Sequence, residues 1–227
     1  MNFFKKTLLG LAFTTISAIA LSQPAAAMTI TVTGMEYANP TTASIQYESK
    51  TESVYAGQFK ATNGANSFLA WCVDIFQLTM FNTAVNDYQI ASATKVQTFN
   101  GDKLALLATR ALGLVKDNVT SGAFQLAAWE IVNETSNSYS LDEGKFKVSK
   151  ITDEQKTLAQ SWLLNLPTVS EYSLTIYTSA TKQDLAVFEK LPAPPASVPE
   201  PATTALLGLG LLGFVASRRK HAKRLEA

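Results

Sequence analysis

The chain has 227 residues, a formal charge of +1 and a hydrophobic content of 47%, which suits one folded domain with its own core. Its only histidine is His221, close to the C-terminus, so the sequence does not predict a Ser–His–Asp or Cys–His hydrolase. Its only cysteine is Cys72, and one thiolate cannot complete a zinc or copper shell. We therefore expect no metal site, no cofactor and no enzyme activity.

The N-terminal segment has the three parts of a secretory signal peptide. Lys5 and Lys6 form a positive start, an apolar run extends from Leu8 to Leu21, and small alanines follow at Ala25–Ala27. The apolar run is too short to be a stable membrane span. We expect a signal peptidase to remove residues 1–27, so the folded domain should occupy residues 28–190.

The first part of this domain has the alternation of β-strands. Polar and apolar residues alternate in Met28–Thr33 and Ala43–Glu48, and Val54–Ala61 is a third candidate. The continuous apolar run Phe68–Phe76 suits a strand that is buried on both faces.

Helical patterns follow, and strands return at the end of the domain. We expect helices from Asn100 to Lys116, from Ser121 to Glu134 and from Thr152 to Asn165, the last opened by the capping box Thr152-Asp-Glu-Gln155, and then strands at Glu171–Thr178 and Asp184–Glu189. This order predicts an α+β domain in which an antiparallel, sandwich-like sheet carries a three-helix insert.

The C-terminal region has a composition of its own. Residues 191–201 are rich in proline and should be an extended linker. Residues 202–227 combine an apolar segment, Ala202–Ala216, with a basic cluster, which predicts a single membrane helix whose end stays in the cytoplasm. Membrane contact is expected only through this helix, before processing.

The motif Pro199-Glu200-Pro201, the Gly/Leu-rich helix after it and the terminal arginine cluster together resemble the PEP-CTERM sorting signal of Gram-negative bacteria. The resemblance implies that an exosortase recognises the tail and cuts it near Glu200. It also implies export to the cell envelope, the cell surface or the extracellular biofilm matrix.

The processed chain is acidic. Without the two basic residues of the signal peptide, the five of the tail and Glu226, it keeps 12 basic and 17 acidic residues, a net charge of −5. Binding to nucleic acid would call for a basic patch instead, so we expect no nucleic-acid partner.

Two residues stand where their chemistry is hard to explain. Cys72 lies in the apolar strand segment, and Gln125 lies in the middle of the most apolar helix. An odd cysteine in an exported protein indicates special chemistry, and burying an unpaired amide costs about 1–3 kcal/mol. If the Cys72 thiolate attacks the Gln125 side-chain carbonyl, ammonia leaves and an internal thioester forms.

The residues around this pair resemble the thioester domains of bacterial surface adhesins, also called TQXA domains. Trp71-Cys72-Val73-Asp74 matches their cysteine motif, and Gln125 followed by Trp129 matches their glutamine motif. The resemblance implies that Cys72 and Gln125 are cross-linked and that Trp71, Asp74 and Trp129 shape the pocket. It also implies an adhesin-like module that bonds to a surface amine or a polysaccharide hydroxyl.

Two alternatives stay open. A buried free cysteine often packs as a small hydrophobe, so the protein could be a noncovalent structural component of the extracellular polymer matrix with an inert Cys72. A glycosidase needs only two carboxylates, and Glu130 and Glu134 stand one helical turn apart, although no motif supports that activity.

Overall fold

The computed structural model describes residues 27–134 and 138–193. The chain divides into two compact units after Glu189, and almost all described residues belong to the first. The predicted signal peptide, the sorting motif Pro199-Glu200-Pro201 and the predicted membrane helix at 202–227 lie outside the described residues. Within them, no helix combines the length and the apolar character needed to cross a membrane.

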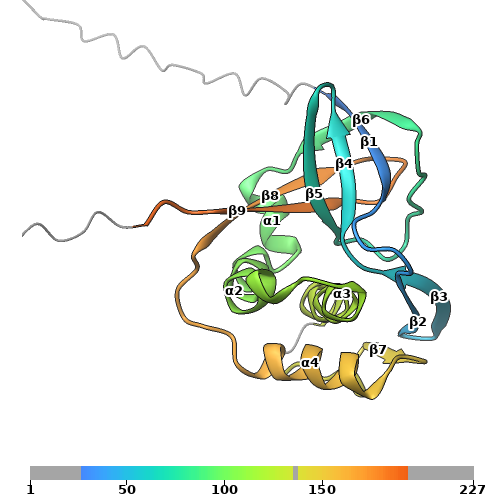
Figure 1. The fold of residues 1–227 in the computed structure, drawn as a ribbon, viewed down its shortest axis with the longest axis vertical. Coiled ribbons are helices and arrows are strands. Elements are labelled where there is room, and N and C mark those ends of the chain that lie inside the picture. The colour runs from blue at the N-terminus through green and yellow to red at the C-terminus, as the bar shows by residue number, and fades with distance from the viewer. Residues whose placement is uncertain (1–26, 135–137, 194–227) are drawn as a thin grey trace, which may run out of the picture. The chain divides into compact units, whose positions relative to one another are not determined.

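Six strands close into a barrel, in the order β1-β4-β5-β9-β8-β6 (Figure 1). These strands are β1 (Met28–Met35), β4 (Phe59–Asn63), β5 (Asn66–Cys72), β6 (Ala84–Ile90), β8 (Tyr172–Thr178) and β9 (Leu185–Lys190). The pairings of β1 with β4 and β6, of β5 with β4 and β9, and of β6 with β8 are antiparallel.

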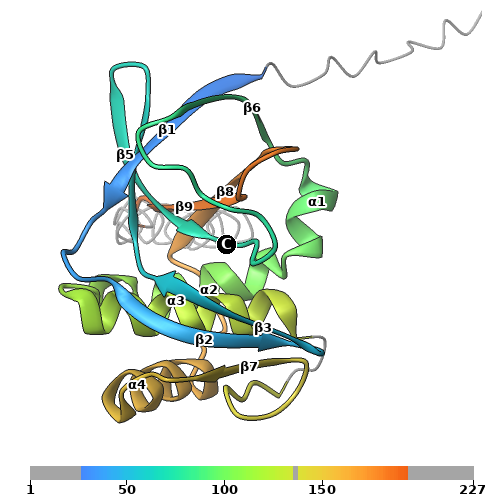
Figure 2. The same ribbon diagram turned by 90° about the vertical axis from the view of Figure 1, so that its right-hand side faces the viewer.

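A smaller sheet has three strands in the order β3-β2-β7. They are β2 (Thr41–Tyr47), β3 (Lys50–Ala56) and β7 (Phe146–Ser149), and both pairings are antiparallel. Figure 2 shows this sheet running alongside α3, below the barrel.

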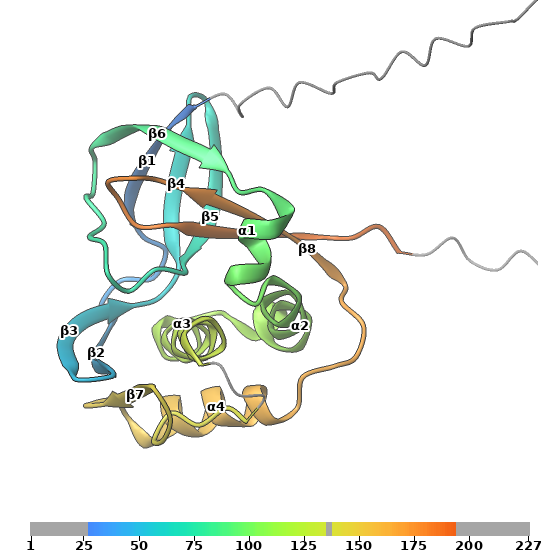
Figure 3. The same cartoon turned by 180° about the vertical axis from the view of Figure 1, so that it is seen from behind.

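The helices form the layer next to the barrel. They are α1 (Ala93–Thr98), α2 (Gly101–Ala111), which continues into a 3₁₀ turn at Leu112–Leu114, α3 (Asn118–Asn133) and α4 (Asp153–Leu164). Figure 1 shows α2 and α3 end-on between the barrel and α4, and Figure 3 shows α1 leading from the barrel into α2. Because α3 has neighbours on every side, all its residues from Ser121 to Ile131 are buried.

The predicted α+β class with antiparallel strands is confirmed, but two features of the prediction are wrong. The sheet is a closed barrel rather than a sandwich, because β6, which was not predicted, pairs with both β1 and β8. The described part also contains four α-helices rather than three, since the short α1 was missed along with the four-residue strand β7.

The predicted third strand, Val54–Ala61, is also two strands in the structure. The chain leaves β3 at Ala56, turns through Gly57 and Gln58, and enters β4 at Phe59, so the two halves belong to different sheets. The apolar run Phe68–Phe76 likewise ends as a strand at Cys72, and Phe76 is 61% exposed.

The helix starts follow their capping chemistry. The predicted capping box of α4 is confirmed, with Thr152 and Gln155 bonding reciprocally. Ser121 does not cap α3, which begins one turn earlier behind the capping box of Asp117 and Thr120. Asn100 precedes α2 as predicted, but its backbone is left-handed (φ 53°) and its Nδ2 donates to Ile131 O at 2.6 Å instead of capping the helix.

Candidate functional site

Cys72 and Gln125 come from elements that pack against each other in the core. Cys72 is the last residue of β5 and pairs with Leu185 of β9. The next residue, Val73, donates its N–H to Asp184 O at 3.1 Å and so continues the pairing of the two strands. Gln125 lies in the middle of α3. The exposed fraction is 2% for Cys72 and 0% for Gln125, so the pair is closed to bulk water.

The Gln125 carboxamide bonds to the backbone of Cys72 in both directions. The Cys72 N–H donates to Gln125 Oε1 at 3.0 Å, and Gln125 Nε2 donates to Cys72 O at 2.8 Å. These two bonds hold the carboxamide carbon beside the residue that carries the thiol. They also supply the buried amide with partners, so its burial does not carry the cost expected from the sequence for an unpaired amide.

The Cys72 thiol is uncharged in this environment. Burial raises its pKa well above the usual value, a side-chain hydrogen bond with Thr79 acts in the opposite direction, and the Asp74 charge raises it further. A thiolate is the better nucleophile, so Cys72 is a poor target for reagents in solution. Its chemistry is restricted to groups that the fold places beside it.

The three residues predicted to shape the pocket make different contacts. Trp71 is buried against Phe124, with ring centroids 4.2 Å apart and ring planes tilted by 40°. Asp74 is half-buried and its Oδ1 accepts from Phe76 N–H at 2.7 Å, which turns the chain after β5. Trp129 is 1% exposed and lies one helical turn after Gln125, and its Nε1 has no partner among the described residues.

Sequence reasoning missed the residues that hold this turn in place. Thr79 donates its hydroxyl proton to Gln183 Oε1, and Gln183 Nε2 donates to Asp74 O at 2.6 Å. Tyr88 donates to Gln183 O at 2.8 Å. Gln183 therefore joins the Thr79 segment, the Asp74 turn and β6, and no local pattern in the sequence indicates this role.

A cavity of about 210 Å³ has Thr79 in its lining. Trp129, Gln77 and Gln183 also line it, together with the aromatic residues Tyr55 and Phe76. Because Thr79 also interacts with the Cys72 thiol, one residue connects this cavity to the pair.

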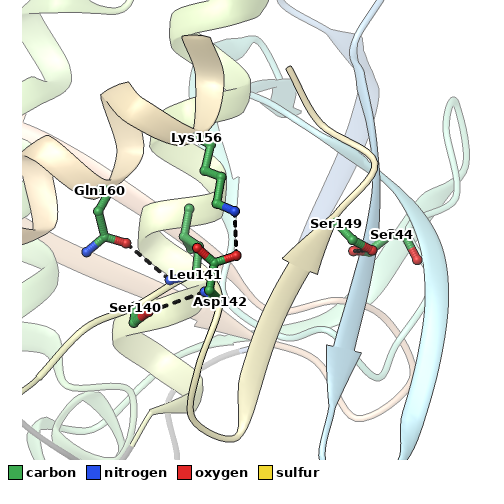
Figure 4. A network of polar contacts seen from close by, with 7 residues as sticks. All are labelled: Ser44, Ser140, Leu141, Asp142, Ser149, Lys156 and Gln160. Atoms are coloured by element: carbon green, nitrogen blue, oxygen red, sulfur yellow. Dashed lines mark hydrogen bonds and ion pairs between the residues drawn. The ribbon is translucent and has the colours of Figure 1, made fainter. Parts of the chain in front are cut away.

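Glu130 and Glu134, the two carboxylates considered for a glycosidase, hold the loop after α3 in place by hydrogen bonds. Glu130 is fully buried and its Oε1 accepts from Ser140 N–H at 2.7 Å, while Glu134 Oε2 accepts from Lys145 N–H at 2.8 Å. Figure 4 shows the same loop held from α4, where Gln160 accepts from Leu141 N–H and Lys156 pairs with Asp142. Both glutamates therefore have a clear structural role.

No group of three or more His, Cys, Asp or Glu residues within 27–134 and 138–193 is arranged to hold a metal ion.

Comparison with known proteins identifies the C-terminal motif. Residues 197–220 match the PEP-CTERM protein-sorting motif, which confirms the prediction from Pro199, Glu200 and Pro201 and indicates an exported protein. No curated protein matches the chain.

Two solved structures are similar to the chain. The N-terminal domain of the pilus tip adhesin Cpa from Streptococcus pyogenes is 15% identical, with 71% of this chain and 99% of that domain covered and a TM-score of 0.42. The N-terminal thioester domain of a Clostridium perfringens surface protein, solved as a cysteine-to-alanine mutant, is 15% identical, with 59% and 89% covered and a TM-score of 0.40. The second belongs to the class that the motifs around Cys72 and Gln125 resemble.

Proposed function

We propose that this exported protein is an adhesin-like surface module that attaches covalently to a partner through an internal thioester between Cys72 and Gln125. The observation that supports the proposal is the reciprocal hydrogen bonding between the Gln125 carboxamide and the Cys72 backbone in a dry core. The carboxamide is thereby held against the residue that carries the thiol, and such proximity favours an intramolecular reaction.

The thioester forms by exchange at the amide carbon. The Cys72 sulfur bonds to Gln125 Cδ, the Cδ–Nε2 bond breaks, and the thiol proton leaves with Nε2 as ammonia. The Cys72 N–H already donates to Oε1 at 3.0 Å, so it stabilises the negative charge that develops on that oxygen during the exchange. The same donor acts again when a partner opens the thioester.

The product is an activated acyl group that is used once, so the protein is proposed to be a ligand rather than an enzyme. A surface amine or a polysaccharide hydroxyl attacks Cδ, the Cδ–Sγ bond breaks, and Sγ leaves with the proton of the nucleophile. The partner is then joined to Gln125 by an amide or an ester, and Cys72 is a free thiol again.

Processing at both ends completes the proposal. A signal peptidase removes residues 1–27, and an exosortase acts on the sorting motif around Glu200 after the C-terminal helix has held the chain in the membrane. The matched motif supports this route to the surface or matrix of a Gram-negative bacterium.

A noncovalent matrix protein is the second candidate, and one observation favours it. Both the oxygen and the nitrogen of the Gln125 amide have a partner and the Cys72 thiol is uncharged, so the pair is also compatible with an unreactive core. Under this alternative, Cys72→Ser lowers stability without changing attachment.

The intact mass of the secreted protein separates the two functions. With the thioester, the mature wild type is lighter than its sequence by one ammonia, and methylamine adds one amine to it. Gln125→Glu keeps the shape of the side chain but cannot lose ammonia, so it has its full mass and does not react. Gln160→Glu, a matched change on α4, keeps the mass deficit.

A wild type of full mass that gains no methylamine, and whose Cys72 is alkylated once the protein is unfolded, would rule out the thioester. The noncovalent function would then stand.

A further inference from the structure

The sulfur of Cys72 needs a hydrogen-bond donor of its own in the proposed reaction. The Cys72 N–H serves the oxygen of Gln125, which it reaches at 3.0 Å. When a nucleophile opens the thioester, the Cδ–Sγ bond breaks and its electron pair goes to the sulfur, where negative charge develops. Because Cys72 is only 2% exposed, bulk water does not hydrate that charge, and the group that stabilises it has to come from the protein.

Thr79 is a side chain that meets this need. It lies in the segment between β5 and β6, and its hydroxyl makes a hydrogen bond with the Cys72 side chain. Burial raises the pKa of the Cys72 thiol, this hydrogen bond lowers it, and the Asp74 charge raises it again. A contact that lowers the pKa of a thiol favours its charged form, so Thr79 stabilises negative charge on the sulfur.

Gln183 holds Thr79 in place. The Thr79 hydroxyl donates to Gln183 Oε1, and Gln183 is fixed at two further points. Its Nε2 donates to Asp74 O at 2.6 Å, and its carbonyl oxygen accepts from the Tyr88 hydroxyl at 2.8 Å. Gln183 is itself buried, so these bonds are shielded from water. The threonine is therefore supported by a residue that has little freedom to move.

The single proton of the Thr79 hydroxyl can serve either neighbour. A hydroxyl donates one hydrogen bond and accepts through two lone pairs. With a free thiol, the S–H group is the donor to the Thr79 oxygen, while the Thr79 proton goes to Gln183 Oε1. The sulfur of a thioester or a thiolate has no proton, so the same contact then requires Thr79 to donate. Rotation about the Cβ–Oγ1 bond is enough to redirect its proton to the sulfur.

We propose that the Thr79 hydroxyl donates a hydrogen bond to the Cys72 sulfur as this atom leaves the acyl carbon, and that Gln183 is the positioning residue that holds Thr79 for this step. The inference rests on the proposed thioester. The nucleophile bonds to Gln125 Cδ, the Cδ–Sγ bond breaks, and the proton of the nucleophile ends on Sγ, so Thr79 keeps its own proton. Formation of the thioester makes the same demand, because the thiol then loses its proton to the departing Nε2.

The test follows the reaction with methylamine by intact mass. Thr79→Val keeps the shape of the side chain but removes the donor, and we expect its thioester to open about tenfold more slowly than that of wild type. Thr79→Ser keeps the donor and should recover most of the wild-type rate. Thr83→Val, an exposed change in the same segment, should react as wild type. A mass deficit that is absent from Thr79→Val and present in Thr79→Ser would support the proposal in the forming direction.

A double variant tests the positioning role of Gln183. Gln183→Met removes both polar atoms of the amide at a similar length, and should also slow the reaction. If Gln183 acts through Thr79, the double variant of Gln183→Met and Thr79→Val reacts at the rate of Thr79→Val alone, whereas independent effects multiply. A purely structural role of Gln183 would lower the melting temperature without this dependence on Thr79, so multiplying effects would overturn the assignment.

The outcomes separate this inference from the function on which it rests. A wild type without a mass deficit rules out the thioester and this role of Thr79 with it. A wild type that carries the deficit, and that methylamine opens at the same rate as Thr79→Val, overturns the role of Thr79 alone. If Thr79→Val does not fold, Thr79→Ala makes the same comparison against Thr79→Ser with a smaller side chain.

Discussion

Glu130 is a carboxyl group in a setting that favours its neutral form. It is fully buried on α3, and burial raises its pKa to about 8, with the Ser140 N–H bond acting in the opposite direction and the Glu134 charge raising it further. In the unfolded chain the pKa returns to its usual value of 4.5. The folded state therefore binds more protons between these two values.

The sign of the pH dependence follows from that difference. The contribution of Glu130 to stability is fully present below about pH 4.5 and is lost as the pH rises through 8. We expect Glu130→Gln, which resembles the neutral acid and can still accept from Ser140 N–H, to match the wild type near pH 4. At pH 8 the variant should be more stable, by an amount of the order of 3 kcal/mol.

Urea unfolding at several pH values measures this effect. Glu143→Gln, an exposed change in the same loop, should leave the pH dependence of wild type intact. A wild-type curve that runs parallel to the Glu130→Gln curve from pH 4 to pH 8 would show that Glu130 does not titrate as described.

The sequence allowed some individual residues of the site to be predicted but not others. Cys72 and Gln125 could be paired in advance because each is polar in an apolar segment and each sits in a short motif. Thr79 and Gln183 could not, because their roles depend on contacts between segments far apart in the sequence, such as that of Gln183 with Asp74, 109 positions away. Nothing in their immediate neighbours reports such contacts.

Among the elements, α3 matters most to the site because it carries both Gln125 and Trp129. Its first turn is fixed by Asp117, whose Oδ1 accepts from Thr120 N–H at 2.8 Å. Capping bonds of this kind contribute about 1 kcal/mol to stability. The negative charge of Asp117 also interacts favourably with the positive end of the helix dipole.

We expect Asp117→Ala to lower the free energy of unfolding by about 1 kcal/mol while leaving the reaction with methylamine unchanged, since Gln125 lies two turns further on. Thr152→Ala, which removes the corresponding cap of α4, is the matched control and should cost a similar amount. A loss of several kcal/mol in Asp117→Ala alone would mean that this cap organises more than its own helix.

Element prediction succeeded where the pattern is local. The capping box at Thr152 and the alternation in Glu171–Thr178 each depend on neighbouring residues. The capping box is present, and the strand is present from Tyr172 to Thr178. The strand β6 was not predicted because its sequence, Ala-Val-Asn-Asp-Tyr-Gln-Ile, does not alternate polar and apolar residues, and only Tyr88 is buried. Its place in the barrel depends on β1 and β8, which pair with it from distant parts of the chain.

For the whole molecule, a thioester would be a cross-link between two halves of the fold. Cys72 and Gln125 are 53 positions apart, and bonding them restricts the unfolded chain much as a disulfide does. The chain-entropy relation for cross-links gives about 4 kcal/mol for a loop of this length.

Opening the thioester should therefore destabilise the protein without any change of sequence. We expect methylamine-treated wild type to melt several degrees below untreated wild type, and the Gln125→Glu variant to show no change on treatment. Calorimetry of the four samples measures this, and equal melting temperatures before and after a confirmed methylamine adduct would contradict the cross-link account.

The pairing of β5 with β9 has a mechanical consequence. Cys72 stands opposite Leu185 at the start of β9, and the chain leaves the barrel at the far end of that strand, at Lys190. A protein tethered through its C-terminus and bonded through Gln125 would carry tension between α3 and the end of β9. Cys72 lies between these two elements, because its backbone bonds to the Gln125 side chain and pairs with Leu185, so the hydrogen bonds of both contacts would bear that load.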